Sequence, residues 1–422
     1  MKILTIVENL GLGGTERVAQ NFSIGYQQAN CDTKVLATKA LGMRATYLAE
    51  KNIEVLPGGE SLQQSIEKIN RWKPDVIHIH RPGYYNELNR LLPLIKLSDT
   101  KVIETNIFAR PDYSSSANLI DAHLHLSNWS LWKWQKWTGN LNQLGAVVPN
   151  LIDCSQIKTV TKGIRHPRLA HLPTGAIILG RIGQPIIAKW NGIIFDALQA
   201  LLKKDEKYHL ALVGLPEILK EKLKSYPQQV QDHVHLLDPI YNDQELNMLY
   251  QSFDIFLHAS QIGESFGMVL AEAHLNEIPI VTLNTPLKDN TQNELVGNGR
   301  GGFVVTDLTN MIKAIELIAN NLNLAEQFGK AGAAHIRENF ELGFVTGKAL
   351  VLCEVLSKNY SRQQTLQALH THQIVTHCND QRIRELCNNM MGELSLKEKI
   401  LLKLIHMPLF YRNYLKAKGI NS

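Results

Sequence analysis

The sequence predicts an α/β protein with two doubly wound, Rossmann-like domains that face a cleft, followed by a helical C-terminal tail. Short apolar runs alternate with segments of helical periodicity from the first residue to about residue 340. These runs form two sets of about five, too many for one compact sheet. After residue 358 the strand-like runs stop, which separates the tail from the two domains.

Five runs in each half are expected to be buried parallel strands. In the first half they are residues 2–8, 33–38, 75–80, 101–107 and 122–127. In the second half they are residues 176–182, 209–214, 233–238, 254–260 and 278–284.

The domain boundary is expected in the stretch 157–175, which is basic, contains two prolines and has weak periodicity. We therefore predict an N-terminal, acceptor-side domain at 1–160, a donor-binding domain at 170–345 and a helical extension at 346–422.

The tail carries two helix signals. Apolar residues between Ile383 and Leu394 recur with helical spacing. The sequence SLKE at 395–398 predicts a capping box, in which Ser395 and Glu398 satisfy each other's amides at a helix start. This second helix is expected to end before Pro408.

Composition narrows the class of protein. The chain has 422 residues, 44% hydrophobic and 20% charged, with a net charge of +5 that does not require a nucleic-acid partner. Five cysteines without a framework pattern favour a reducing compartment. No apolar run is long enough for a signal-peptide core or a bilayer span. We expect a cytoplasmic protein, with peripheral contact at the inner membrane face as an open alternative.

The most informative segment is GESFGMVLAEAHLNEIPIV, residues 263–281. Glu264 is expected where a helix begins and Glu272 two turns inside it. Backbone amides of Ser265, Phe266, Gly267 and Met268 would form an anion site at the helix start. A ligand that fits this arrangement has a phosphate bound by the amides, and hydroxyl groups on either side of it that are bound by the two carboxylates. A sugar nucleotide has this composition. In the alternative interpretation, Glu264 only interacts with the helix dipole and Glu272 is a solvated helix residue. If the two glutamates were the sole evidence, this alternative would be favoured.

The segment GRIGQPIIAKWN, residues 180–191, argues against that alternative. Arg181 and Lys189 follow the first strand of the second domain and, with the nearby Gly183, could hold a diphosphate and neutralise its charge as it leaves. The alternative is an ordinary basic surface loop.

A glycine-rich turn, ENLGLGGTERVAQ at 8–20, leads from the first strand into a helix. Gly11, Gly13 and Gly14 would let the backbone approach a ligand closely. It is not the dinucleotide fingerprint, because Glu16 stands at the third glycine position. Alone, the loop could be only a tight turn.

These segments, together with ELVGNGRGGFVV at 294–305 and VVPNLID at 147–153, resemble the retaining glycosyltransferases of family 4 over about residues 1–355. The resemblance implies the two-domain glycosyltransferase-B fold. It implies that Arg181 and Lys189 hold the donor diphosphate, that Glu264 contacts the transferred sugar and that Glu272 contacts the ribose. It also implies that Pro239 and Ile240 contact the base and that Gly13 and Gly14 lie near the donor phosphates.

The chemistry of that family retains the anomeric configuration, and the departing diphosphate helps to deprotonate the acceptor. The chain contains no Asp-x-Asp, which fits a metal-independent enzyme without a cofactor. Many relatives carry a histidine near the sugar, and here Asn106 stands at that position. Of His78 and His80, which are more often buried core residues at such places, His80 is the better acceptor-side candidate.

Two further segments could contact a membrane. Trp129, Trp132, Trp134 and Trp137 cover a broad helical arc that includes two lysines, which indicates either a lipid-facing surface or partial burial with snorkelling lysines. The basic tail from Lys397 to Lys418 could bind anionic lipid or pack on the domains. The histidines and cysteines between 370 and 387 match no zinc spacing, so no metal site is expected.

The sequence thus predicts a retaining hexosyltransferase that uses a nucleotide-diphosphate sugar. Its acceptor would be a glycan or glycolipid hydroxyl, and its role cell-surface polysaccharide synthesis. A sugar-nucleotide epimerase on the same fold and a non-catalytic sugar-nucleotide-binding protein remain alternatives. The donor base, sugar, linkage and oligomeric state cannot be predicted from the sequence.

Overall fold

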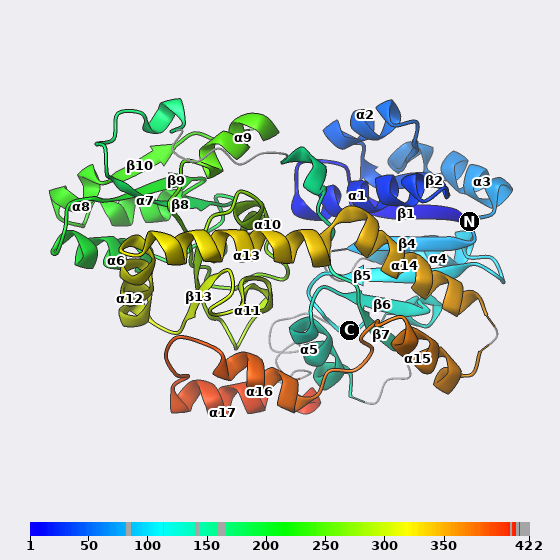
Figure 1. Cartoon of the computed structure of the whole chain (residues 1–422). Coiled ribbons are helices and arrows are strands. Elements are labelled where there is room, and N and C mark those ends of the chain that lie inside the picture. Colours follow the sequence, from blue (N-terminus) through cyan, green and yellow to red (C-terminus); the bar gives the residue numbers. More distant parts are fainter. Residues whose placement is uncertain are drawn as a thin grey trace. The chain divides into compact units, whose positions relative to one another are not determined.

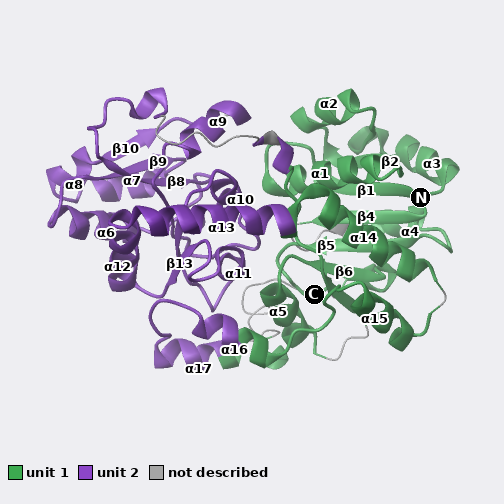
Figure 2. Cartoon of the chain, in the orientation of Figure 1, with its two compact units in different colours: residues 1–153, 339–383, 403–422 green, residues 154–338, 384–402 purple. Residues whose placement is uncertain are grey.

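The computed structural model describes residues 1–81, 86–112, 114–139, 143–157, 165–240, 242–358, 360–405, 407–410 and 413 (Figure 1). It divides the chain into two units (Figure 2). Unit 1 comprises Met1–Asp153, Asn339–Ile383 and Lys403–Ser422, and unit 2 comprises Cys154–Glu338 and Arg384–Leu402. Each unit is a Rossmann-like α/β fold on one parallel sheet. The boundaries 1–160, 170–345 and 346–422 stay predictions.

The sheet of unit 1 has the strand order β3-β2-β1-β4-β5-β6-β7. The strands are β1 (Lys2–Asn9), β2 (Asp32–Ala40), β3 (Glu54–Pro57), β4 (Val76–Arg81), β5 (Lys101–Asn106), β6 (Ala122–His125) and β7 (Leu144–Val147). The five predicted strands are confirmed. The two edge strands were not predicted, because each is only four residues long and only half buried.

Seven helices lie wholly within the described part of unit 1. They are α1 (Gly14–Gln28), α2 (Gly42–Glu50), α3 (Leu62–Trp72), α4 (Asn86–Ile95), α5 (Asn128–Thr138), α14 (Leu342–Ser357) and α15 (Arg362–Thr371). Helix α14 packs closely on α1, since a Cβ atom built at Gly25 would lie 2.1 Å from Oγ1 of Thr346. The C-terminal part of the chain therefore completes the first unit.

The sheet of unit 2 has the strand order β10-β9-β8-β11-β12-β13. The strands are β8 (Ile177–Ile182), β9 (Tyr208–Val213), β10 (Val234–Leu237), β11 (Ile255–His258), β12 (Ile280–Leu283) and β13 (Gly302–Val305). The helices are α6 (Ile193–Leu202), α7 (Glu217–Leu223), α8 (Gln228–Asp232), α9 (Asp243–Tyr250), α10 (Met268–Leu275), α11 (Thr291–Val296) and α12 (Leu308–Ala319). The five strands predicted here are also confirmed.

The remaining elements complete the chain. Three helices include residues of both units: α13 (Leu322–Phe340), α16 (Asp380–Asn388) and α17 (Leu396–Ile405). Five short 3-10 helices are η1 (Gly59–Ser61), η2 (Ala117–Leu119), η3 (Cys154–Gln156), η4 (Pro167–Leu169) and η5 (Ile187–Lys189).

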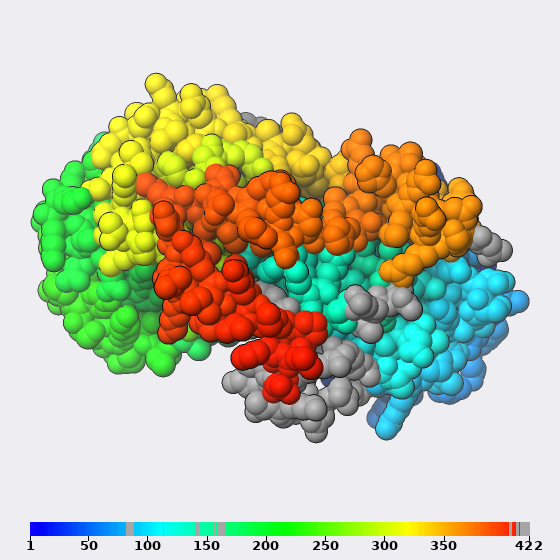
Figure 3. Space-filling view, turned by 90° about the horizontal axis from the view of Figure 1, so that it is seen from below, coloured from blue at the N-terminus to red at the C-terminus, as the bar shows by residue number. Residues whose placement is uncertain are grey.

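The C-terminal region is helical, as predicted, and Figure 3 shows its residues at the surface in orange and red. The amide of Glu398 donates to Oγ of Ser395 at 3.2 Å, and the amide of Ser395 donates to the Glu398 carboxylate at 2.9 Å. The predicted capping box is therefore present, and α17 ends at Ile405, before Pro408. Within the described ranges no helix is both long and apolar enough to cross a membrane. Much of the basic tail, including Lys416 and Lys418, lies outside those ranges.

The lipid-facing interpretation of the tryptophan segment is wrong for three of its four indoles. Trp129, Trp132 and Trp134 are 1%, 6% and 3% exposed. His123 and His125, both on β6, stack on Trp134 with ring centroids 5.3 and 4.9 Å away. Helix α5 buries this arc because it covers its own sheet.

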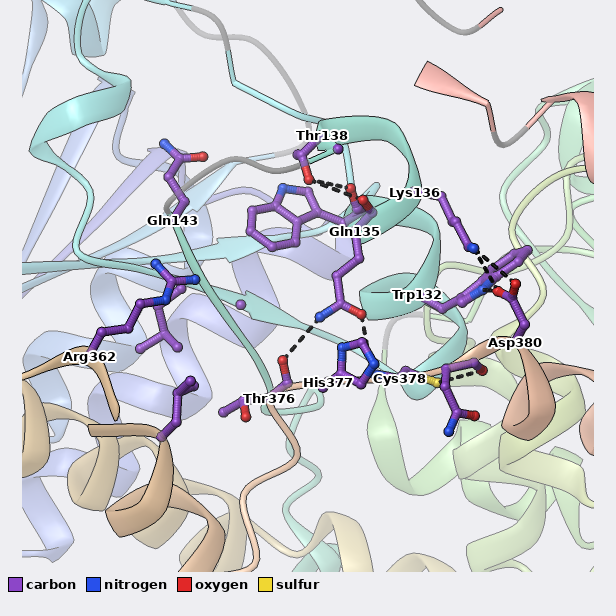
Figure 4. A pocket seen from close by; sticks show the side chains of 16 residues that line it. Trp132, Gln135, Lys136, Thr138, Gln143, Arg362, Thr376, His377, Cys378 and Asp380 are labelled. Carbon is purple, nitrogen blue, oxygen red and sulfur yellow. Dashed lines mark hydrogen bonds and ion pairs between the residues drawn. The ribbon is translucent and has the colours of Figure 1, made fainter. Parts of the chain in front are cut away.

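Lys133 on the same helix is also buried, with its Nζ 4.9 Å from the centroid of the Trp137 ring. A cation held over an indole in this way is stabilised by the ring electrons. Burial is therefore the better description of α5, but the expected snorkelling is wrong for Lys133, whose side chain stays buried. Lys136 pairs with Asp380 at 2.8 Å (Figure 4).

Candidate active site

Three loops of unit 2 meet where strands β8, β11 and β12 end. They cover residues 183–191, 259–267 and 284–292. The amides of Gln261 and Ile262 donate to the carbonyl of Ala188 at 3.0 and 3.2 Å. The amides of Asp289 and Thr291 donate to the carbonyls of Ile262 and Glu264 at 3.3 and 3.1 Å. The motif 180–191 is thus joined by main-chain hydrogen bonds to the two residues directly before the motif 263–281.

Glycine is required at the centre of this junction. Gly263 has φ +68°, and a Cβ atom built there would lie 1.8 Å from the carbonyl oxygen of Asp289. No side chain fits this close approach, so the residue before Glu264 is fixed by backbone packing.

We expect Gly263→Ala to lower the free energy of unfolding by about 3 kcal/mol or more, since it adds a backbone clash to left-handed strain. Gly175→Ala is the matched control, because Gly175 has φ +89° but open space at its Cβ position. The control should cost about 1–2 kcal/mol. Urea denaturation of both variants measures the difference, and equal costs would contradict a packing requirement at Gly263.

The carboxylate of Glu264 is hydrogen-bonded through both of its oxygens. Its Oε2 accepts a hydrogen bond from Nζ of Lys189 at 2.7 Å, and its Oε1 lies 3.1 Å from Nε2 of His258. Burial favours a raised pKa, but the His258 hydrogen bond and the charges of Lys189 and Arg181 together lower the pKa of Glu264 to about 2. The carboxylate is therefore ionised at neutral pH, although it is only 7% exposed.

The position of Glu264 relative to its helix differs from the prediction. Helix α10 begins at Met268, after Gly267 with φ +99°, so Glu264 lies four residues before the helix. Glu272 is accordingly about one turn inside α10 rather than two, and its Oε2 accepts a hydrogen bond from the hydroxyl of Tyr250 at 2.9 Å. The sequence did not reveal that two left-handed glycines carry an extra loop here.

Arg181 is brought close to Lys189, but its guanidinium is turned onto the chain. It is 1% exposed and donates to the carbonyls of Ile182 and Lys189, each at 2.9 Å. Its guanidinium carbon lies 5.1 Å from the centroid of the Trp190 ring, and burial lowers the pKa of Arg181 to about 10. Arg181 thus fixes the loop that presents the partly exposed Lys189, and its direct contact with a diphosphate stays a prediction.

The other donor-side candidates lie on the same sheet. Gly183 follows β8, and Gly214 approaches it so closely that a Cβ atom at Gly214 would lie 1.9 Å from the Gly183 carbonyl. Pro239, which is exposed, and Ile240, half-buried, follow β10. Ser265 and Met268 are half-buried, and Phe266 and Gly267 are buried. The roles of these residues stay predictions.

His258, the last residue of β11, was not predicted to belong to the site. Its ring is fully buried between Glu264 and Thr282, with Nδ1 2.9 Å from the Thr282 hydroxyl. Burial, followed by the positive charge of Arg181, lowers the pKa of His258 to about 4. One signal was available in the sequence: a histidine ends an apolar strand six residues before Glu264. A buried imidazole ring needs hydrogen-bond partners, and these had to come from the residues near the strand end.

Acid should destabilise this site. The pKa of His258 is lower in the folded chain than its usual 6.5, so below pH 6.5 the unfolded chain binds a proton that the folded chain does not. This contribution to the free energy of unfolding is complete above pH 6.5, falls between pH 6.5 and 4, and amounts to about 3 kcal/mol. Urea denaturation at pH 7.5 and 4.5 measures it, and His258→Gln should show a smaller loss than wild type. An equal loss would assign the acid sensitivity to other groups.

The unit 1 candidates differ in how open their surroundings are. Gly13 caps α1, and the Glu16 carboxylate folds back toward it, whereas a Cβ atom at Gly14 would meet open space. His80 is 1% exposed and packs on Phe22 and His78, with ring centroids 5.4 and 4.0 Å away.

Asn106 holds the loop that follows β5. Its side-chain amide donates to the carbonyl of Arg110 at 2.8 Å and accepts from the Arg110 amide at 3.1 Å. The structure thus places both His80 and Asn106 in structural contacts, and their acceptor-side roles stay predictions.

A buried ion-pair network beside these residues was also missed. Arg81 ends β4 and pairs with Glu104 at 2.7 Å and with Asp112, and all three side chains are at most 5% exposed. The two carboxylates raise the pKa of Arg81 against the effect of burial. The pairing depends on strand neighbours and on a later loop, which a linear sequence does not show. In the described part of the chain no group of three or more potential metal ligands forms a site.

The comparison with known proteins agrees with the geometry of unit 2. Residues 174–321 match the family described as Glycosyl transferases group 1. This segment is thus similar to the glycosyl transferases of group 1. It contains Arg181, Lys189, Glu264 and Glu272, the residues singled out by the two motifs.

A longer match supports the glycosyltransferase assignment. The chain is 23% identical over 321 residues to the phosphatidyl-myo-inositol mannosyltransferase of Mycobacterium leprae, which covers 70% of this chain and 79% of that protein.

Solved structures of glycosyltransferases share the fold. The Anabaena HepE protein, in complex with UDP and glucose, matches 85% of this chain and all of its own, with a TM-score of 0.64 and 18% identity. A glycosyltransferase of Rickettsia africae matches 85% of this chain and 99% of its own, with a TM-score of 0.68 and 16% identity. The predicted two-domain glycosyltransferase-B fold is therefore confirmed.

Proposed function

We propose that this glycosyltransferase moves a hexose from a nucleotide-diphosphate sugar to a hydroxyl of a glycan or glycolipid, with retention of configuration and without a metal ion. We further propose that it works in the cytoplasm, in the synthesis of a cell-surface polysaccharide. The observation that carries the proposal is the Lys189–Glu264 pair at 2.7 Å, held between buried Arg181 and His258.

The Lys189–Glu264 pair suits a nucleotide-sugar donor because its carboxylate and its ammonium group can each bind a different part of the donor. The Glu264 carboxylate is ionised and can accept hydrogen bonds from sugar hydroxyls. The Lys189 ammonium can turn to the diphosphate and stabilise the negative charge that develops as the glycosidic C–O bond breaks. In this scheme the acceptor oxygen bonds to the anomeric carbon on the same face, and its proton passes to a departing phosphate oxygen.

The relatives support a nucleotide-sugar donor and leave its identity open. The Anabaena protein is in complex with UDP and glucose, whereas the Mycobacterium leprae protein is a mannosyltransferase. We therefore propose a hexose donor without choosing its base. The roles of Glu272 at the ribose and of Pro239 and Ile240 at the base follow from the resemblance alone.

A turnover assay tests the proposal. Purified protein is incubated in EDTA with each of UDP-glucose, UDP-N-acetylglucosamine, GDP-mannose and ADP-glucose, with and without an extract of acceptor glycans. Proton NMR of the product should show an α-linkage formed from an α-linked donor, and only when acceptor is present. A donor that is altered without acceptor would instead indicate the epimerase, and a β-linked product would exclude retention.

A further inference from the structure

The loop between β10 and α9 in unit 2 is supported by its sheet from one side only. Strand β10 lies at the end of the sheet and pairs with β9, and none of its four residues is fully buried. Of the residues that follow it, the structure describes 238–240 and 242. Ligands in open parallel sheets bind at the carboxyl ends of strands. A ligand here therefore meets a loop whose shape depends on contacts from outside the sheet.

A single guanidinium group bridges the two ends of this loop. Arg168, on η4, donates through Nη1 to the carbonyl of Asp238 at 2.8 Å and through Nη2 to Oε1 of Glu245 at 3.0 Å. Asp238 directly precedes Pro239, and Glu245 lies in the first turn of α9. Because the donors of a guanidinium lie in one rigid plane, Arg168 holds the two ends of the loop at a fixed separation.

The segment that carries Arg168 is also fixed beyond the other end of α9. The amide of His166 donates to Oγ of Ser252, two residues after the end of this helix, at 2.6 Å. Nδ1 of His166 in turn accepts from the amide of Arg168 at 3.2 Å. Part of the predicted linker at 157–175 thus belongs to the framework of unit 2, and it holds the backbone of Arg168 in place.

Helix α9 connects the loop with Glu272. The hydroxyl of Tyr250, the last residue of α9, donates to Oε2 of Glu272 at 2.9 Å. In the proposed function Glu272 contacts the ribose, and Pro239 and Ile240 contact the base. The residues proposed for the two halves of the nucleoside are therefore linked through α9, the helix that the segment with Arg168 holds at both ends.

We propose that Arg168 is a positioning residue that makes the donor site selective for one nucleotide base. This role rests on the proposed function, in which Pro239 and Ile240 contact the base. Bases differ in the donors and acceptors along their edges, and a site rejects the wrong base only when its own polar groups are held in position. Without the guanidinium of Arg168 the main chain at these two residues is less fixed, and the site discriminates less.

The alternative for Arg168 is an ordinary surface ion pair with Glu245, since the two side chains are 33% and 40% exposed. Exposed ion pairs contribute little to stability. Loss of Arg168 should therefore leave the melting temperature nearly unchanged under either interpretation. The two interpretations differ in the order of the loop and in base selectivity, which can be measured separately.

Hydrogen–deuterium exchange of the full chain tests the positioning step without a ligand. In Arg168→Gln, peptides that contain Ile240 and Glu245 should exchange about threefold faster than in wild type, because the loop opens more often. Arg165→Gln is the matched control, since Arg165 lies in the same segment but donates to the carbonyls of residues 172, 173 and 176. It should leave the exchange of those peptides as in wild type. Unchanged exchange in Arg168→Gln, or an equal rise in both variants, would overturn the proposal.

Isothermal titration calorimetry with UDP, GDP and ADP tests base selectivity. Wild type and Arg165→Gln should bind one of the three about tenfold or more tightly than the others, and in Arg168→Gln this preference should fall to about threefold or less. Inorganic pyrophosphate, which has no base, should bind wild type and Arg168→Gln equally. Weaker pyrophosphate binding by Arg168→Gln would indicate a general loss of the site and would overturn the assigned role.

The pattern of binding separates this proposal from the proposed function. If wild type bound none of the three nucleotides, the nucleotide-sugar donor itself would be contradicted, and the role of Arg168 with it. If wild type bound all three equally, or if Arg168→Gln kept the wild-type preference, only the role of Arg168 in base selectivity would be overturned, and the donor site would stand.

Discussion

Replacement of Lys189 by alanine should lower kcat about a hundredfold, a loss on the order of 3 kcal/mol of transition-state stabilisation. The reason is that Lys189 is the partly exposed cation of the pair, with 28% of its side chain accessible, whereas Arg181 is turned onto main-chain carbonyls. No other charge of the 180–191 loop is as well placed to follow the diphosphate as it leaves. Steady-state kinetics with the established donor measures the effect.

Lys203→Ala is the matched control, because Lys203 is an exposed lysine at the end of α6 in the same unit. Its kcat should equal that of wild type. A loss below tenfold for Lys189→Ala would contradict the role assigned to its ammonium group. An equal loss in both variants would indicate a nonspecific effect of surface charge.

Glu264→Gln should lower kcat by about a hundredfold as well, since it exchanges a charged hydrogen-bond acceptor for a neutral amide without a change of shape. The carboxylate is ionised throughout the working range, because its pKa is lowered to about 2. The amide also weakens the hold on Lys189 and His258, so the melting temperature should fall by a few degrees.

The variant Glu272→Gln distinguishes the role of Glu272 from that of Glu264. If Glu272 contacts the ribose in ground and transition states alike, its variant should raise KM for the donor and leave kcat nearly unchanged. Glu217→Gln, at an exposed position on α7, is the control. A lowered kcat for Glu272→Gln with unchanged KM would reverse the assignment of the two residues.

Much of the fold was predictable from the sequence, because long buried strands of a parallel sheet are nearly continuous apolar runs. The edge strands Glu54–Pro57 and Leu144–Val147 escaped prediction since a half-buried strand of four residues carries little pattern. The tryptophan segment misled because an arc of indoles has the same periodicity whether it faces lipid or its own sheet. The contacts of Trp134 with His123 and His125 of β6, and of Trp132 with Asp380 far along the chain, distinguish the two cases.

The candidate site also has features that the sequence predicts and features that it does not. Glu264, Lys189 and Arg181 could be selected because they stand in short motifs at strand ends, where ligands bind. The geometry of these three side chains could not be predicted from the sequence. Arg181 points toward the carbonyls of residues 182 and 189 because the loop turns back on itself, and this turn has no local sequence pattern. The support from His258 and Thr282 comes from neighbouring strands, whose order is a property of the sheet rather than of any local pattern.

The central claim is that the buried, ionised Glu264 and its lysine partner form a nucleotide-sugar site. The most direct test is a thermal-shift panel of UDP-, GDP- and ADP-sugars in EDTA, with wild type and Glu264→Ala. A donor at about 100 times its Kd should stabilise the fold by about 2.7 kcal/mol. We expect a shift for one base and one sugar, and a smaller shift in Glu264→Ala. No shift with any donor, or an equal shift in wild type and Glu264→Ala, would contradict it.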